Sequence, residues 1–179
     1  MMRLFIGLSL PGPVRERLQS LQSGLPGARW VKPENLHMTL RFIGEVADDA
    51  ADDLDAALAG VTAPAFEFRL KGLDTFGSAR KLRSLWLGAE PPEPLVHLHA
   101  KIETVTQRTG FAAEGRKFKP HVTLARFNGG RPARLGDYLH AHAGFEAVPV
   151  PVDVFTLFRS HLGHGGSHYQ HLADYPLHD

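Results

Sequence analysis

His37-Met38-Thr39-Leu40 is a tetrapeptide that recurs, with one substitution, as His121-Val122-Thr123-Leu124 in the second half of the chain. Hydrophobic and polar residues alternate around both copies, which predicts one strand over residues 36–43 and another over residues 121–127. Side chains two positions apart share one face of a strand, so each copy presents an imidazole beside a hydroxyl group. The alternating residues between them, with Phe42 further along the first strand, are expected to face the core.

The rest of the chain predicts strands and helices in alternation. The other expected strands cover residues 4–10, 66–71, 84–88, 152–158 and 169–177. The expected helices cover residues 13–24, 48–60, 91–110 and 135–143. No linker separates regions of different composition, so residues 1–179 are expected to form one compact body of mixed α/β or α+β class, built from two lobes.

The composition excludes several classes of protein. The 179 residues include 20 Lys and Arg, 19 Asp and Glu, 11 His and no Cys. A chain without cysteine has no disulfide framework, thiolate metal site or cysteine nucleophile. A net charge of +1 excludes a strongly basic protein that coats duplex DNA. No apolar stretch approaches the roughly 20 residues of a membrane helix and no signal-peptide pattern is present, so a cytoplasmic location without a membrane partner is expected.

The repeated tetrapeptide predicts acid–base chemistry if the two lobes face each other across a cleft. His37 and His121 would then lie opposite each other, each beside a threonine hydroxyl. An imidazole titrates near pH ~6.5, so one of the pair can accept a proton while the other donates one. Hydroxyl groups are neutral donors that can hold the non-bridging oxygens of a phosphate. The pattern therefore suits a phosphodiester substrate and requires no metal.

A basic stretch surrounds the second copy and favours an anionic ligand. Between Gly115 and Gly136 the chain has no acidic residue and these basic ones: Arg116, Lys117, Lys119, Arg126, Arg131 and Arg134. Strict alternation from His121 would direct Arg126 to the opposite face, so a bulge must intervene if Arg126 reaches the cleft. Arg41 is in phase with His37, which would direct it into the site or to its rim.

These segments resemble the two-histidine (2H) phosphoesterases, specifically the RNA 2',3'-cyclic phosphodiesterase branch, the ThpR/LigT proteins once named 2'-5' RNA ligases. The resemblance extends in order over essentially the whole chain. It rests on Arg3-Leu4-Phe5-Ile6, residues 35–45, Leu85-Trp86-Leu87-Gly88, residues 118–126, and Ser160-His161-Leu162 with Gly165, Tyr169 and Pro176-Leu177. It implies an α+β, bilobal fold: two pseudo-symmetric lobes of antiparallel sheet with flanking helices around a central cleft.

The resemblance also implies a role for each matching residue. His37 would be the proton donor and His121 the proton acceptor, although the near symmetry of the site leaves the opposite assignment open. Thr39, Thr123 and Arg126 would bind the phosphate. The implied enzyme is a phosphoric diester hydrolase that needs no metal or cofactor. It would convert the 2',3'-cyclic phosphate end of RNA, or a small cyclic nucleotide, to a 2'-phosphomonoester, as a monomer without an obligate protein partner.

Three other functions remain open on the sequence. The first is 2'-5' RNA ligation, which is closely related to the reverse of the same chemistry. The second is a non-catalytic module that binds RNA ends or nucleotides; two intact His-x-Thr pairs argue against it. The third is a metal-dependent hydrolase, suggested by His161, His164, His168 and His171 in the C-terminal segment.

Overall fold

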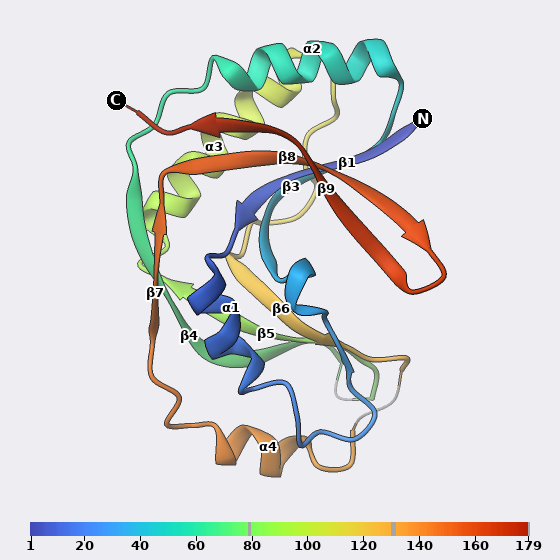
Figure 1. The fold of residues 1–179 in the computed structure, drawn as a ribbon, viewed down its shortest axis with the longest axis vertical. Coiled ribbons are helices and arrows are strands. Elements are labelled where there is room, and N and C mark those ends of the chain that lie inside the picture. Colours follow the sequence, from blue (N-terminus) through green and yellow to red (C-terminus); the bar gives the residue numbers. More distant parts are fainter. Residues whose placement is uncertain (79, 130–131, 179) are drawn as a thin grey trace.

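The computed structural model describes residues 1–78, 80–129 and 132–178, and shows an α+β fold with two antiparallel sheets (Figure 1). The basic residue Arg131 lies outside these ranges. None of the helices in them combines the length and hydropathy that a membrane span requires.

The first sheet contains the N-terminal strand and carries the first copy of the tetrapeptide at one edge. Its strands are β1 (Met2–Ser9), β3 (His37–Val46), β8 (Val154–Gly163) and β9 (Gly166–Pro176), in the order β3-β1-β8-β9. Every pairing in it is antiparallel. The β8–β9 hairpin extends beyond the other strands, as Figure 1 shows in orange and red.

The second sheet carries the other copy next to its edge. Its strands are β2 (Arg29–Trp30), β4 (Phe66–Gly77), β5 (Leu82–Glu90), β6 (His121–Arg126) and β7 (Val148–Val152), in the order β2-β6-β5-β4-β7. The order β6-β5-β4 repeats the arrangement β3-β1-β8 of the first sheet. The two strands with the tetrapeptide, β3 and β6, lie close to each other where the sheets meet. The expected α+β, bilobal fold is confirmed.

Helices cover the outer face of each sheet. They are α1 (Gly12–Gln19), α2 (Asp48–Ala59), α3 (Glu93–Arg108) and α4 (Leu135–Ala141), with a short 3-10 helix, η1 (Pro33–Asn35). In Figure 1, α2 and α3 lie over the first sheet, while α1 and α4 lie at the second. Asp48 and Asp49 in the first turn of α2 suit the positive end of the helix dipole. Leu54 and Leu98 are fully buried between the helices and the sheet, and burial stabilises each by about 1.5–3 kcal/mol.

The predicted strand over residues 152–158 is correct for residues 154–158, which lie in β8, but wrong in including Val152, which ends β7. The chain leaves the second sheet after Val152 and enters the first at Val154, so two strands of different sheets meet at Asp153. The backbone carbonyl of Asp153 accepts a hydrogen bond from the Leu177 amide at 2.8 Å. The alternating pattern continues through the junction because residues on both strands are buried, and this continuity conceals the change of sheet.

Candidate active site

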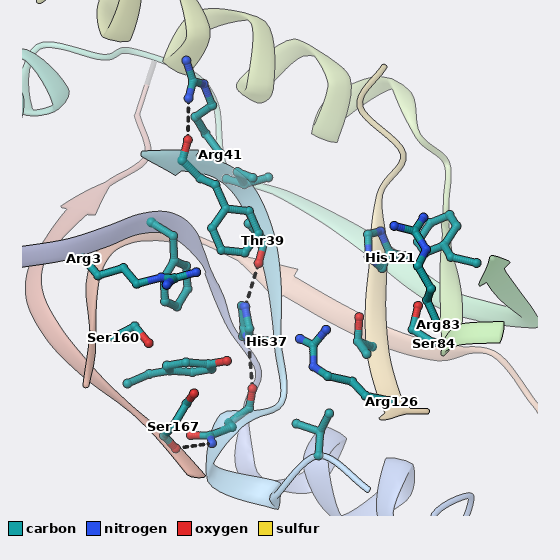
Figure 2. Close-up of a pocket in the computed structure, with 18 of the residues that line it drawn as sticks. Arg3, His37, Thr39, Arg41, Arg83, Ser84, His121, Arg126, Ser160 and Ser167 are labelled. Atoms are coloured by element: carbon teal, nitrogen blue, oxygen red, sulfur yellow. Dashed lines mark hydrogen bonds between the residues drawn. The ribbon is translucent and has the colours of Figure 1, made fainter. Parts of the chain in front are cut away.

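A cleft of about 950 Å³ separates the two sheets and contains both copies of the tetrapeptide (Figure 2). His37 and Thr39 reach it from β3, and His121 and Thr123 reach it from β6. Arg126 also lines the cleft, and Figure 2 shows its side chain extending into the space between the two histidines. All five residues expected at the site therefore lie around one cavity.

A β-bulge follows each copy and determines which later residue faces the cleft. Ile6 pairs with Arg41 and Gly7 pairs with Thr39, so Leu40 is an extra residue in β3. In β6, Leu124 is the extra residue at the same position of the tetrapeptide. An extra residue reverses the side-chain alternation beyond it. Arg126 thereby returns to the face of His121. This is the bulge that the sequence requires if Arg126 is to reach the cleft.

The same reversal in β3 overturns two expectations. Phe42, expected in the core, has 56% of its surface exposed and lines the cleft. Arg41, expected to share the face of His37, is only 6% exposed. It still borders the cleft, but its guanidinium group points toward Glu103 of α3 and away from His37. Phe42 and Arg126 therefore occupy corresponding positions in the two halves of the site.

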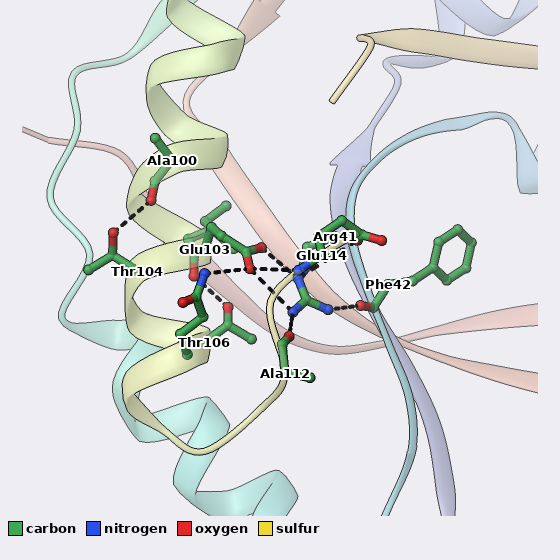
Figure 3. A network of polar contacts seen from close by, with 10 residues as sticks. Arg41, Phe42, Ala100, Glu103, Thr104, Thr106, Ala112 and Glu114 are labelled. Atoms are coloured by element: carbon green, nitrogen blue, oxygen red, sulfur yellow. Dashed lines mark hydrogen bonds and ion pairs between the residues drawn. The ribbon is translucent and has the colours of Figure 1, made fainter. Parts of the chain in front are cut away.

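Arg41 belongs to a buried polar network that joins β3 to α3 and to the loop after it (Figure 3). Its Nε donates to Oε2 of Glu103 at 2.6 Å, and Glu114 lies at 3.8 Å. Its two other nitrogens donate to the backbone carbonyls of Phe42 and Ala112. Arg41 is consequently a structural residue that holds the loop bordering the cleft.

Each imidazole is oriented by a hydrogen bond to the backbone carbonyl two residues before it. Nδ1 of His37 donates to the carbonyl of Asn35 at 2.7 Å, and Nδ1 of His121 donates to the carbonyl of Lys119 at 2.6 Å. A carbonyl oxygen only accepts, so the proton of each neutral ring is on Nδ1 and Nε2 is a free base. Nε2 of His37 accepts a hydrogen bond from the Thr39 hydroxyl at 2.7 Å.

The surroundings keep both rings neutral at pH 7 in the free protein. Burial lowers the pKa of His37 to about 4; the hydrogen bond to Asn35 opposes this shift, and the charge of Arg126 adds to it. Burial also lowers the pKa of His121, against the effect of the Lys119 carbonyl and with that of Arg126. An anion bound between the rings would favour their charged forms and raise both pKa values.

Aromatic rings enclose each histidine on its own side of the cleft. The ring centroid of His37 lies 5.0 Å from that of Phe5 and 5.1 Å from that of Tyr169. The ring centroid of His121 lies 4.9 Å from that of Phe76 and 5.7 Å from that of Trp86. These contacts account for the burial that lowers the two pKa values.

The β8–β9 hairpin borders the cleft through contacts that the sequence pattern does not indicate. Nζ of Lys32 donates to the carbonyl of Gly165 at 2.6 Å, and Nδ2 of Asn35 donates to the carbonyl of Ser167 at 2.8 Å. Lys32 precedes η1 and Asn35 is its last residue, so both donors are far from the hairpin in sequence. The segment that orients His37 therefore also fixes the hairpin.

The C-terminal histidines do not gather into one cluster. His161 and His168 are cross-strand partners with ring centroids 6.1 Å apart, and Nε2 of His161 contacts Oε1 of Gln170 at 2.8 Å. Across the described ranges, no three His, Cys, Asp or Glu side chains are placed to hold a metal ion together. The geometry thus gives no support to a metal centre in the hairpin.

The site combines two neutral imidazoles, two hydroxyl groups and one arginine around a cavity. A base and a conjugate acid on opposite sides can move one proton to and one proton from an ester group. The hydroxyls and the guanidinium group can hold anionic oxygens in place. The arrangement suits acid–base chemistry on a phosphate ester.

Known proteins resemble this chain over most of its length. Residues 10–164 match the family described as the 2'-5' RNA ligase superfamily. The RNA 2',3'-cyclic phosphodiesterase of Aeropyrum pernix is 35% identical, covering 85% of this chain and 87% of its own; that of Thermotoga maritima is 31% identical, covering 97% and 94%. The crystal structure of E. coli LigT complexed with 3'-AMP is similar with a TM-score of 0.80, at 27% identity over 99% of both chains.

Proposed function

The chain belongs to the 2'-5' RNA ligase superfamily, and we propose that it acts as an RNA 2',3'-cyclic phosphodiesterase in which His37 and His121 transfer the protons. One observation carries the proposal. In both copies of the tetrapeptide, a backbone carbonyl accepts a hydrogen bond from Nδ1 and leaves Nε2 as the reactive nitrogen, in a cleft that both threonines line. The LigT complex with 3'-AMP supports a nucleotide as the ligand.

The reaction is a hydrolysis with two proton transfers. Nε2 of His121 accepts a proton from water as the water oxygen bonds to phosphorus. The bond between phosphorus and the 3' oxygen breaks, and Nε2 of His37 donates a proton to that oxygen. The products are a 2'-phosphomonoester and a 3' hydroxyl. Each transfer contributes about 10²–10⁴ to the rate.

The protonation states follow from the charge of the substrate. In the free protein the lowered pKa values leave both rings neutral, as the acceptor must be. The cyclic phosphodiester carries one negative charge, which raises the pKa of both rings and favours the charged form that the donor needs. The assignment of this role to His37 rests on the family resemblance. Thr39, Thr123 and Arg126 hold the phosphate oxygens and neutralise the charge of the transition state.

The test is an assay on a nucleoside 2',3'-cyclic phosphate in the presence of EDTA, with the product identified as the 2'- or 3'-phosphomonoester. We expect 2'-phosphomonoester from the wild type, and little from His37→Ala or His121→Ala. His97→Ala, which removes an exposed histidine of α3, is the matched control and is expected to retain full activity. The proposal is wrong if both site variants keep wild-type turnover or if EDTA abolishes activity.

The same assay separates the alternatives. Formation of a 2'-5' linkage when a 5'-hydroxyl oligonucleotide replaces water would identify ligation as the main reaction. Tight binding without any product would identify a non-catalytic module. We further propose that residues 1–179 act as one bilobal domain, because the cleft draws residues from both sheets. The monomeric state and the cytoplasmic location stay predictions.

A further inference from the structure

A second arginine stands directly opposite Arg126 on the neighbouring strand. In the register of β2 and β6, Arg29 is the partner of Arg126. Side chains of directly opposed residues in an antiparallel pair share one face, with Cβ atoms about 4.5–5.5 Å apart. Both arginines are exposed and both line the cleft. The pairing of β2 with β6 therefore places the two arginines side by side, and the bulge at Leu124 directs the face that they share toward the cleft.

Such a pair of like charges is unfavourable unless an anion compensates it. Within the residues that the structure describes, no carboxylate lies within ion-pair distance of either guanidinium group. The carboxylates Glu103 and Glu114 are engaged by the buried Arg41 instead. If Arg126 binds the reacting phosphate, as the proposed function requires, that phosphate leaves Arg29 without an anionic partner.

The fold nevertheless holds the short strand β2 in this position. The Val31 amide donates to the carbonyl of Leu124 at 2.9 Å, and Nε2 of Gln22 donates to the carbonyls of Leu124 and Val31 at 3.1 and 2.8 Å. Trp30 packs against the buried Tyr138 with ring centroids 6.1 Å apart. Arg29 is thus presented by a fixed backbone, which lowers the entropic cost of binding a ligand.

We propose that Arg29 binds a second phosphate group, the internucleotide phosphate on the 5' side of the terminal nucleotide, while Arg126 holds the cyclic phosphate. This proposal rests on the proposed function. It assigns the enzyme an RNA strand rather than a free cyclic mononucleotide as its preferred substrate. Arg29 would raise the affinity for the strand and take no part in the proton transfers.

The experiment compares three substrates with the wild-type protein, Arg29→Gln and Arg69→Gln. The substrates are adenosine 2',3'-cyclic phosphate, the adenosine dinucleotide with the same cyclic end, and that dinucleotide with an uncharged methylphosphonate linkage. Arg69 is exposed on β4 and does not line the cleft, so its variant is the matched control. Both substitutions remove one positive charge, so a change in overall charge affects them equally.

We expect the wild type and Arg69→Gln to prefer the charged dinucleotide roughly tenfold in kcat/KM over the other two substrates, the effect of one hydrogen-bonded ion pair. Arg29→Gln should lose this preference, through KM, and keep its activity on the mononucleotide. Between 50 and 200 mM salt, kcat/KM for the charged dinucleotide should fall about 2.5-fold more than for the uncharged one, and Arg29→Gln should remove this difference.

Two results would overturn the inference while the proposed function stands. One is hydrolysis of the mononucleotide and both dinucleotides with equal efficiency by the wild type. The other is an equal loss on all three substrates in Arg29→Gln, which would assign Arg29 to the reacting phosphate. Failure of the wild type to hydrolyse any of them would instead refute the proposed function itself.

Discussion

Replacing Arg41 should lower the stability of the fold, whereas replacing Arg126 should lower the rate of the reaction. The two arginines follow the two copies of the tetrapeptide, yet the bulges send them to opposite environments. Arg41 is 6% exposed and pairs with Glu103, whose side chain is 15% exposed, at 2.6 Å. Arg126 is exposed and lies in the cleft. Arg41→Ala is expected to destabilise the fold, and Arg126→Ala is expected to slow the reaction.

The magnitude for Arg41 follows from its partners. Removing one member of a buried ion pair costs about 3–5 kcal/mol. Glu103 keeps hydrogen bonds from Gln107 at 2.9 Å and from the Glu114 amide at 3.1 Å, so the lower end applies, about 3 kcal/mol. For a chain of this size that corresponds to a decrease of about 6–12 °C in Tm. Arg126→Ala should change the free energy of unfolding by less than about 0.5 kcal/mol.

The magnitude for Arg126 follows from the phosphate it would hold. A hydrogen bond to a charged group contributes about 1.5–3 kcal/mol, which predicts a loss of roughly 10- to 150-fold in kcat/KM. The assay pairs thermal unfolding by circular dichroism with hydrolysis of a cyclic nucleotide at 25 °C, where both variants are folded. Arg41→Ala should then retain more activity than Arg126→Ala. The reverse order of activity, or an unchanged Tm in Arg41→Ala, would refute this account of the two bulges.

Three further outcomes are expected. In a titration followed by NMR, His37 should titrate near pH 4 in the free protein, and inorganic phosphate should raise its pKa; a free-protein value near 6.5 would contradict its burial. Because the folded-state pKa values of His37 and His121 are lowered, the unfolded chain binds more protons below about pH 6.5, so stability should fall from there toward pH 4, and less steeply in His37→Gln by denaturant titration. Gly7→Ala places a Cβ 2.6 Å from the Met38 carbonyl and should lower stability by about 1–3 kcal/mol, whereas Gly12→Ala, with nothing within 4 Å, should not.

The site was largely predictable because its chemistry lies in a repeated local pattern. His-x-Thr on a strand places both groups on one face whatever the surrounding sheet does, so His37, Thr39, His121 and Thr123 could be identified from their spacing alone. Alternation and helix signals predicted a mixed α/β or α+β class, and the resemblance to a known family narrowed this to the α+β fold.

The errors arose where a single residue changes the pairing register. Nothing in the sequence distinguishes Leu40 or Leu124, as an extra residue, from an ordinary inward-facing leucine. The predicted directions of the Arg41 and Phe42 side chains, which follow the first bulge, were therefore wrong. The change of sheet at Asp153 was missed because burial continues on both sides of it. Contacts between distant segments, such as Lys32 with Gly165, leave no local pattern at all.

The two bulges also give the cleft a direction. A site built from two equivalent halves could accept a ligand in either of two orientations, only one of which places the leaving oxygen at the proton donor. At the corresponding positions after the bulges, however, one half presents the ring of Phe42 and the other the guanidinium group of Arg126. An apolar wall and a cationic wall do not bind the same part of a nucleotide, so the first cleft-facing residue after each bulge makes the two orientations unequal.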